Sequence, residues 1–362
     1  MGISKSTALK PAADGNMIAY RYRPKAQAPV REEIPIPTPG PDEILIRVLA
    51  GGVCHSDVGI LDPNCLGDAI TRTCTMGHEG SGLVVALGSS VPDTHPELII
   101  GSYIAVYCVD SCFKASCYAC RTGRDNVCPN GTWIGLGGDG AWASHCVLRA
   151  VLAVPVPGNI HTIPPAVVAI STDAVLTPYH ALKTCVGLQP EQTILILGAG
   201  GLGLNAISIA KHCLNARYVL ASDKRESSLA QALEMGADHA VLVDGLAGFL
   251  QESQTIVDIV VDFVGTQETF DIAVSVIAPG GRIQVVGLHA KTLQFATSVL
   301  MGKDVAIGSN FCGTKAELVE VLAAIAEGKI KPKVETRPLD DCVQVLDELR
   351  NGRLKNRVAL IP

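Results

Sequence analysis

Residues 193–226 read TILILGAGGLGLNAISIAKHCLNARYVLASDKRE, and this stretch decides the fold of the second half of the chain. An apolar run that predicts a strand is followed at once by the pattern G-x-G-x-x-G, formed by Gly198, Gly200 and Gly203. Gly198 permits a tight turn, Gly200 leaves room for a pyrophosphate, and Gly203 lets the next helix pack closely on the strand. The helix N-terminus then offers free N–H groups to phosphates. The stretch therefore predicts a dinucleotide site.

An acidic residue at the end of the next strand refines this prediction. Asp223 follows Gly203 by twenty residues, where a carboxylate can accept hydrogen bonds from both ribose hydroxyls. The same carboxylate would repel a 2′-phosphate, so we expect NAD(H) to be favoured over NADP(H). Lys224 and Arg225 follow directly. Their positive charges would favour a 2′-phosphate and so NADP(H), or the two residues form only a solvated loop. Lys224 is included among the candidate cofactor-binding residues.

Working outward from this stretch, apolar strands alternate with amphipathic helices from about residue 166, which predicts a doubly wound parallel sheet. The first part is rich in Pro and Gly and carries short runs typical of β-strands, such as EILIRVLAGGVC and GSYIAVYCV. We therefore expect an α/β protein with a β domain at residues 1–165, completed by a tail from about residue 305 to 362. A Rossmann-type dinucleotide-binding domain is expected at residues 166–304.

Composition narrows the class of protein. The chain of 362 residues has 29 basic and 35 acidic residues, without a basic stripe to neutralise phosphates, so nucleic acid is not an expected partner. It has no apolar run near the roughly 20 residues that a membrane span needs. The N-terminus lacks the apolar region of a secretory signal, which predicts a cytoplasmic location. Met1 to Ser6 fit the loose pattern for myristoylation, M-G-x-x-x-[ST], which often matches by chance.

Two short stretches in the β domain carry metal-binding residue types. GGVCHSD places Cys54 beside His55, Ser56 and Asp57, and MGHEGSGLVVALGSSV places His78 beside Glu79. The second stretch follows the pattern G-H-E-x-x-G-x-x-x-x-x-G-x-x-V from Gly77 to Val91. Together with the dinucleotide motif, these stretches make the chain resemble the zinc-dependent medium-chain alcohol dehydrogenases over nearly its whole length.

The resemblance implies a GroES-like β domain, a zinc ion between the domains and a set of site residues. Cys54 and His78 match zinc ligands, Glu79 a carboxylate near the metal, and Ser56 the group that passes on the substrate proton. Asp57 would orient the histidine. The cofactor contacts implied are His55 and Arg357 at the pyrophosphate, and Thr177 and Val286 near the nicotinamide. Gly59 occupies the position at which the family often has a histidine that ends the proton relay. The sequence therefore does not assign the outer part of the proton path.

The third zinc ligand departs from the family pattern. In ISTDAVLTPYHALK the usual cysteine position is occupied by Asp173. A Cys, His and carboxylate set still supplies two anionic ligands and a neutral one, so zinc remains expected. In the alternative, Asp173 is a helix N-cap and the third ligand is Glu79 or water.

A cysteine-rich stretch, YCVDSCFKASCYACRTGRDNVCPN, begins at Tyr107. The family binds a structural zinc with the spacing Cys-x2-Cys-x2-Cys-x7-Cys. Here Cys117, Cys120 and Cys128 keep the last two gaps, but Lys114 stands at the first cysteine position. A two-residue insertion would make Cys112 the first ligand, with Cys108 as the reserve candidate. A disulfide pair and a lobe without metal are the competing interpretations.

These features predict a zinc- and NAD-dependent dehydrogenase that transfers a hydride between an alcohol carbon and nicotinamide C4. The substrate would be a small alcohol, aldehyde or ketone. The resemblance also implies a homo-dimer or homo-tetramer. Two alternatives are a zinc-free NADPH-dependent enone reductase of the same fold and a non-catalytic NAD-binding protein.

Overall fold

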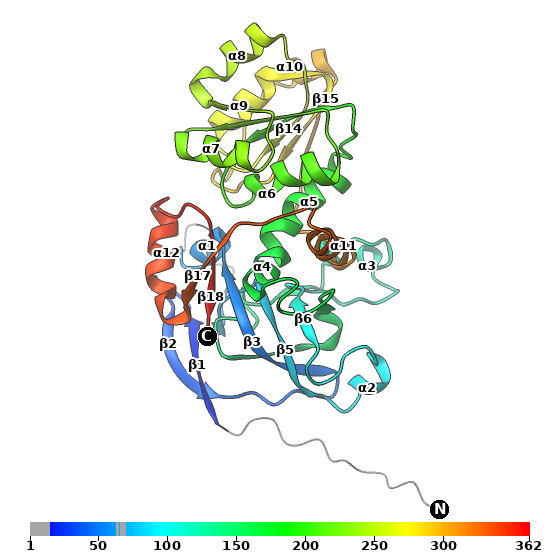
Figure 1. The fold of residues 1–362 in the computed structure, drawn as a ribbon, viewed down its shortest axis with the longest axis vertical. Coiled ribbons are helices and arrows are strands. Elements are labelled where there is room, and N and C mark those ends of the chain that lie inside the picture. The colour runs from blue at the N-terminus through cyan, green and yellow to red at the C-terminus, as the bar shows by residue number, and fades with distance from the viewer. Residues whose placement is uncertain (1–14, 63–64, 66–69) are drawn as a thin grey trace, which may run out of the picture.

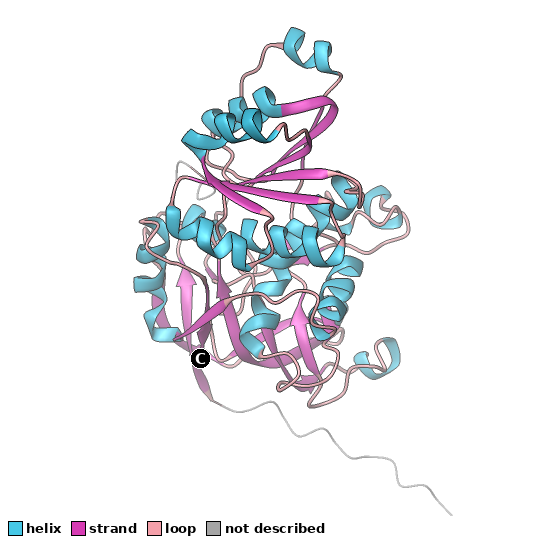
Figure 2. Cartoon of the chain, turned by 45° about the horizontal axis from the view of Figure 1, so that its top comes forward, coloured by secondary structure: helices cyan, strands magenta, loops and turns pink. Residues whose placement is uncertain are grey.

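The computed structural model describes residues 15–62, 65 and 70–362. In the view of Figure 1, one part of the chain lies above the other. The upper part is a parallel sheet with helices, and the lower part consists mainly of antiparallel strands (Figure 2). This arrangement confirms the predicted α/β fold with a β domain and a Rossmann-type domain. The myristoylation pattern at residues 1–6 lies outside the described residues.

Within the described residues, the lower part contains three sheets. A small sheet has the order β2-β1-β4, and a larger one has the order β10-β6-β5-β3-β18-β17, with β9 also pairing with β3. The strands are β1 (Asn16–Tyr22), β2 (Val30–Pro35), β3 (Glu43–Val53), β4 (Cys74–Thr75), β5 (Gly80–Leu87), β6 (Tyr103–Val106), β9 (His145–Arg149), β10 (Ala153–Pro155), β17 (Val334–Pro338) and β18 (Arg357–Ile361). A third, two-stranded sheet pairs β7 (Val109–Asp110) with β8 (Thr132–Trp133).

The long strand β3 organises the lower part because it pairs on both edges. Its buried side chains Ile44, Leu45 and Ile46 are fully enclosed. At its end, β18 pairs with it in antiparallel register, with Val358 opposite Val53. The C-terminal strand thus completes the first domain and lies beside the segment that begins at Cys54.

The upper part is a six-stranded parallel sheet with the order β13-β12-β11-β14-β15-β16. Its strands are β11 (Thr193–Leu197), β12 (Tyr218–Asp223), β13 (His239–Leu242), β14 (Val257–Asp262), β15 (Ile277–Val285) and β16 (Ala306–Ser309). The strand order reverses beside β11, because β12 pairs on one side of it and β14 on the other. In such sheets the crevice at the carboxyl ends of the strands at this reversal binds the ligand.

The helices of the upper part connect its strands, as the alternating pattern predicts. They are α6 (Gly203–Ser208), α7 (Glu226–Glu234), α8 (Leu246–Ser253), α9 (Gln267–Val276) and α10 (Thr297–Lys303), with the short turns η6 (Ile209–Cys213) and η7 (Val243–Gly245). The last strand, β16, extends this sheet, so the tail leaves it after Ser309, a few residues beyond the expected boundary near residue 305. The domain limits themselves remain a prediction.

One helical segment connects the two parts. It consists of α4 (Pro165–Ile170), the π-helical turn η4 (Ser171–Val175), α5 (Leu176–His180) and a second π-helical turn, η5 (Ala181–Cys185). The other helical elements are α1 (His55–Gly59), α2 (Val91–Thr94), α3 (Tyr118–Arg121), η2 (Asp125–Val127), η3 (Ala150–Leu152), α11 (Lys315–Ala326), η8 (Leu339–Asp341) and α12 (Cys342–Arg350). Among the described residues, no helix is long and apolar enough to cross a membrane.

Candidate active site

Four potential ligands meet between the two parts of the molecule. Cys54 follows the last residue of β3, His78 and Glu79 precede β5, and Asp173 lies in the π-helical turn η4. One ligand atom from each lies within 4.8 Å of the ligand atoms of the others. The N-cap interpretation of Asp173 is wrong, because its backbone lies inside a continuous helical segment. Such single π-helical turns are frequent at functional sites.

Asp173 directs one carboxylate oxygen at the other donors. Its Oδ2 lies 3.2 Å from Cys54 Sγ and 3.5 Å from His78 Nε2. Burial alone would raise the pKa of Asp173, but its hydrogen bond with His78 and the imidazole charge outweigh burial and lower the pKa. The carboxylate is therefore held in its charged form, which is the form that binds metals.

His78 is oriented from behind by Asp57. The imidazole Nδ1 lies 3.2 Å from Asp57 Oδ1, so Nε2 faces the other donors. Asp57 is fully buried, and its Oδ2 accepts a hydrogen bond of 2.8 Å from the backbone N–H of Cys54. Burial opposes a charge on His78, but Asp57 and Asp173 raise the pKa of its imidazole well above the ordinary value. The surroundings thus favour positive charge at this point.

Glu79 is turned toward an arginine. It forms a buried ion pair with Arg357, and the second carboxylate oxygen, Oε2, has no hydrogen-bond partner among the described residues. Burial raises the pKa of Glu79 to about 8, although the guanidinium partly offsets this effect. Glu79 belongs to the same group of donors, but the contacts with Cys54 Sγ and His78 Nε2 are made by Asp173 Oδ2.

This donor set fits zinc. Thiolate, imidazole nitrogen and carboxylate oxygen are the usual zinc ligands, and two anionic donors with one neutral donor match the charge of the ion. Glu79 belongs to the same group of donors, and its buried Oε2 has no hydrogen-bond partner among the described residues. Ser56 also lies at this site, with its Oγ 3.9 Å from Cys54 Sγ.

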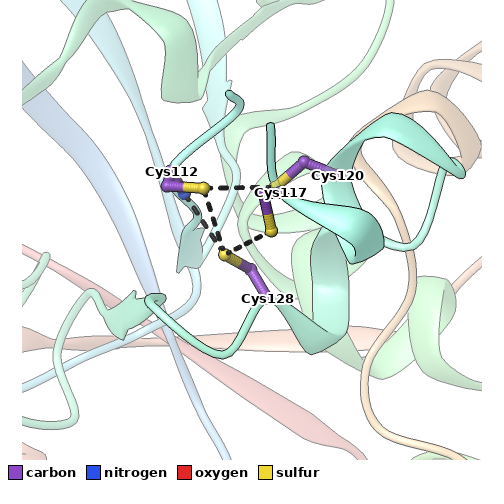
Figure 3. A group of neighbouring side chains, drawn as sticks. All are labelled: Cys112, Cys117, Cys120 and Cys128. Atoms are coloured by element: carbon purple, nitrogen blue, oxygen red, sulfur yellow. Dashed lines mark hydrogen bonds between the residues drawn. The ribbon is translucent and has the colours of Figure 1, made fainter. Parts of the chain in front are cut away.

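A second group of potential ligands consists of Cys112, Cys117, Cys120 and Cys128 (Figure 3). The Sγ–Sγ distances are 3.7 Å for Cys112–Cys120, 3.6 Å for Cys112–Cys128 and 3.9 Å for Cys117–Cys128. Four sulfurs at the usual Zn–S distance would stand ~3.8 Å apart at the corners of a tetrahedron. The cluster fits a structural zinc, and its four thiols are not joined as disulfides.

The structure also places the reserve candidate elsewhere. Cys108 lies 3.7 Å from Cys312, sulfur to sulfur, outside the four-cysteine cluster. Cys112 occupies the first position despite the longer gap before Cys117. A longer first loop is thus compatible with four thiols at tetrahedral spacing.

The glycine-rich turn joins β11 to α6 at the strand-order reversal. Gly198 has φ +88°, a conformation that residues with a side chain rarely adopt. A Cβ on Gly203 would lie 1.9 Å from the Gly198 carbonyl oxygen, so only glycine fits. Asp223 Oδ2 accepts a hydrogen bond of 2.9 Å from Ala199 N, which ties the predicted ribose carboxylate to this turn.

Arg357 connects the turn to the first cluster. A Cβ on Gly201 would lie 2.4 Å from Arg357 Cδ, so the arginine side chain crosses the turn on its way to Glu79. Three other predicted cofactor residues, His55, Lys224 and Val286, lie on other segments of the chain. His55 is exposed with its ring centroid 6.2 Å from that of His289, Lys224 is exposed, and Val286 N donates to Asp262 O at 2.8 Å.

Comparison with known proteins places this geometry in a family. Residues 40–158 match the alcohol dehydrogenase GroES-like domain, and residues 201–327 match the zinc-binding dehydrogenase family. The structure of acetophenone reductase from Geotrichum candidum in complex with NAD is 33% identical, with a TM-score of 0.83, over 97% of this chain and 98% of that one.

The chain belongs to the zinc-type medium-chain dehydrogenases. An NAD-dependent alcohol dehydrogenase of Sulfurisphaera tokodaii is 28% identical over 91% of this chain and 96% of its own length. The alcohol dehydrogenase of Aeropyrum pernix is 27% identical with a TM-score of 0.86, and the match covers 95% of this chain and all of that one.

Two contacts of this medium-chain dehydrogenase were not predicted from the sequence. The ion pair of Glu79 with Arg357 joins residues 278 positions apart, and no local pattern signals it. The hydrogen bond from Thr177 Oγ1 to Asp173 Oδ1, by contrast, joins residues four apart on one helical segment. That spacing brings side chains together on a helix, so the sequence did contain a signal for this contact.

Proposed function

We propose that this protein is a zinc- and NAD-dependent dehydrogenase that interconverts an alcohol with an aldehyde or ketone. The observation that carries the proposal is the single site at which Cys54, His78 and Asp173 converge beside the glycine-rich turn, joined to it by Arg357. The NAD-dependent alcohol dehydrogenases among its relatives support it.

Each group has a stated role in the proposal. Cys54, His78 and Asp173 would hold zinc, with Glu79 as a fourth donor held back by Arg357. Bound zinc supplies a Lewis acid that lowers the pKa of the substrate hydroxyl or polarises the carbonyl. Bound NAD(H) supplies the hydride acceptor or donor at nicotinamide C4. Gly198, Gly200, Gly203 and Asp223 would bind its pyrophosphate and ribose, with His55, Lys224, Thr177, Val286 and Arg357 around it.

Side chains of this protein would transfer the proton of the substrate hydroxyl. Ser56 Oγ, close to Cys54, would accept the proton of the substrate hydroxyl while passing its own outward. Since Gly59 has no side chain to continue the relay, the proton would leave through the cofactor ribose and water. Asp57 keeps His78 in the orientation that presents Nε2 to the site. Cys54 and His78 are buried, which limits the access of bulk water to the donors.

The two alternative functions have less support. A zinc-free enone reductase does not need the convergence of Cys54, His78 and Asp173, and a 2′-phosphate would meet the Asp223 carboxylate. A non-catalytic protein would not need Ser56 beside those donors. The cytoplasmic location belongs to the proposal as well, since the reaction uses a soluble cofactor.

The deciding experiment measures zinc per chain by elemental mass spectrometry, on protein purified without chelator. We expect about two zinc ions, about one in Cys54→Ala and about one in Cys117→Ala, because each variant breaks one site. Wild-type protein should also oxidise members of an alcohol panel with NAD, whereas Cys54→Ala should not. Zinc at the four cysteines alone, together with no turnover, would contradict the proposal.

We also propose that the protein is a homo-oligomer assembled through β16. This strand ends the six-stranded sheet, and all four of its residues are exposed. Large apolar side chains lie in and before it, with Phe295 50% and Met301 80% exposed. An edge strand presents unpaired backbone groups, and exposed apolar side chains beside it promote association, so proteins usually cover such a surface. A second copy of the chain, related by a twofold axis, would cover it.

A further inference from the structure

Thr177 uses its hydroxyl in an unusual way for a helical threonine. Its Oγ1 donates a hydrogen bond of 2.6 Å to Asp173 Oδ1, and the residue is 5% exposed. Ser171 and Thr172, on the same helical segment, instead donate to main-chain carbonyl oxygens, those of Val167 and Ala169. The latter pattern is common for hydroxyl side chains within helices. The Thr177 hydroxyl is thus committed to a carboxylate at the candidate metal site.

This contact distinguishes the two oxygens of Asp173. Oδ1 is occupied by Thr177, and Oδ2 is the oxygen that faces Cys54 Sγ and His78 Nε2. A carboxylate can bind a metal through either oxygen or through both, whereas a thiolate has a single donor atom. An aspartate at the usual cysteine position therefore needs an orienting partner that a cysteine would not need.

The position of Thr177 is itself set from the dinucleotide-binding sheet. Its main-chain carbonyl accepts a hydrogen bond of 3.4 Å from Asn310 Nδ2. Asn310 Oδ1 in turn accepts a bond of 3.0 Å from Gln284 Nε2, and Gln284 is 3% exposed on β15. The Thr177 backbone is thereby linked through Asn310 to the buried side chain of Gln284 on β15.

We propose that Thr177 is a positioning residue for the catalytic metal, which makes Asp173 a ligand through Oδ2 alone. The inference rests on the proposed function, because that function places zinc at Cys54, His78 and Asp173. It gives both oriented ligands a dedicated partner, Asp57 for His78 and Thr177 for Asp173. Loss of such an outer partner typically weakens metal affinity about 10- to 100-fold.

The test compares Thr177→Val, which keeps the shape and loses the hydroxyl, with Thr177→Ser, which keeps the hydroxyl. Zinc affinity is measured by competition with a chromogenic chelator, and cobalt-substituted protein gives an absorption spectrum that reports the ligands without turnover. We expect Thr177→Val to bind zinc at the first site about 10- to 100-fold more weakly, with an altered cobalt spectrum. Thr177→Ser should bind within about threefold of the wild type.

Two controls separate positioning from general damage. Thr172→Val removes another fully buried hydroxyl one residue from Asp173, and it should leave zinc affinity unchanged. A urea midpoint close to that of the wild type shows that a variant has folded, and Thr177→Ala replaces Thr177→Val if the valine variant does not fold.

The outcomes distinguish this inference from the proposed function. If the wild type holds both zinc ions and Thr177→Val binds zinc and cobalt as the wild type does, the positioning role is overturned and the proposed function stands. If Thr177→Ser and Thr172→Val weaken zinc binding as much as Thr177→Val, the hydroxyl is not responsible and the inference also fails. If the wild type holds zinc only at the four cysteines, both ideas fail.

Discussion

Asp173 shows how one residue changes the demands on its neighbours. An oxygen donor replaces the sulfur that is usual at this position of the family, and the charge at the site is preserved. The Asp173 carboxylate lies within hydrogen-bond distance of Cys54, His78 and Thr177. The chemistry expected at this site therefore remains that of a zinc dehydrogenase.

Ser56 provides a direct test of the proton path. Ser56→Ala removes the hydroxyl that would accept the substrate proton, so we expect kcat to fall by about 10²- to 10⁴-fold. The variant should still bind NADH, measured by fluorescence titration, because Ser56 lies outside the glycine-rich turn. A variant with wild-type turnover would rule out the relay role of Ser56.

A substitution of Asp223 tests the preference for NAD(H) over NADP(H). Its two carboxylate oxygens accept hydrogen bonds of 2.9 Å from Ala199 N and Arg225 N, so Asp223→Asn preserves an acceptor and removes the charge. We expect the ratio of kcat/KM for NADP over NAD to rise about 10- to 100-fold, since repulsion of the 2′-phosphate is lost. Arg225→Ala is the matched control and should lower the same ratio. An unchanged ratio in Asp223→Asn would mean that another residue selects the cofactor.

At the scale of elements, α11 is attached to the central helical segment by a buried pair. His180 Nδ1, at the end of α5, lies 2.8 Å from Glu317 Oε2 near the start of α11. Burial would lower the pKa of His180, but hydrogen bonds with Cys185 and Glu317 raise it to about 10. Burial would raise the pKa of Glu317, but His180 and Thr184 lower it to about 2. Both groups are therefore charged over a wide range of pH.

This pair predicts a pH-dependent contribution to stability. The raised pKa of His180 stabilises the fold fully below about pH 6.5 and loses this effect as pH rises toward 10. The lowered pKa of Glu317 stabilises it above about pH 4.5 and loses this effect as pH falls toward 2. Glu317→Gln should thus lower the free energy of unfolding by about 2 kcal/mol at pH 6 and by less near pH 10.

The measurement is the urea midpoint of wild type and variant between pH 5.5 and 10. Glu320→Gln is the control, because this residue lies on the same helix and forms an exposed ion pair with Lys183. Its effect should be at most about 1 kcal/mol. A stability loss in Glu317→Gln that is equal at pH 6 and pH 10 would contradict the assignment of charge to His180.

For the whole molecule, assembly through the exposed edge strand β16 can be tested by measuring the mass of the protein in solution. We expect sedimentation velocity to find two or four chains for the wild type. Ile307→Lys, at a β16 position that is 37% exposed, should shift the protein to fewer chains, because a lysine on an edge strand opposes pairing. Ile256→Lys changes an exposed apolar residue just before β14 and should leave the assembly unchanged. A monomeric wild type would refute assembly through this edge.

Much of the architecture could be predicted because its signals are local. Gly198 and Gly203 lie in the turn between a strand and a helix, and Asp223 ends the next strand. The alternation of strands and helices from about residue 166 indicates the parallel sheet. The π-helical turn around Asp173 could not be predicted in this way. Its backbone differs from an α-helix by one hydrogen-bond register, which the periodicity of apolar residues does not reveal.

Local patterns in the sequence were enough to predict the fold class, the dinucleotide turn with its carboxylate, and the supply of Cys, His and acidic residues for two metal sites. Which of these residues meet depends on the packing of distant segments. Cys54 and Asp173, 119 positions apart, converge only because β3 and the helical segment pack together. Packing also directs Glu79 to Arg357, includes Cys112 in the four-cysteine cluster and leaves Cys108 beside Cys312. Residue type and spacing are local properties, whereas the choice of partner depends on contacts between distant segments.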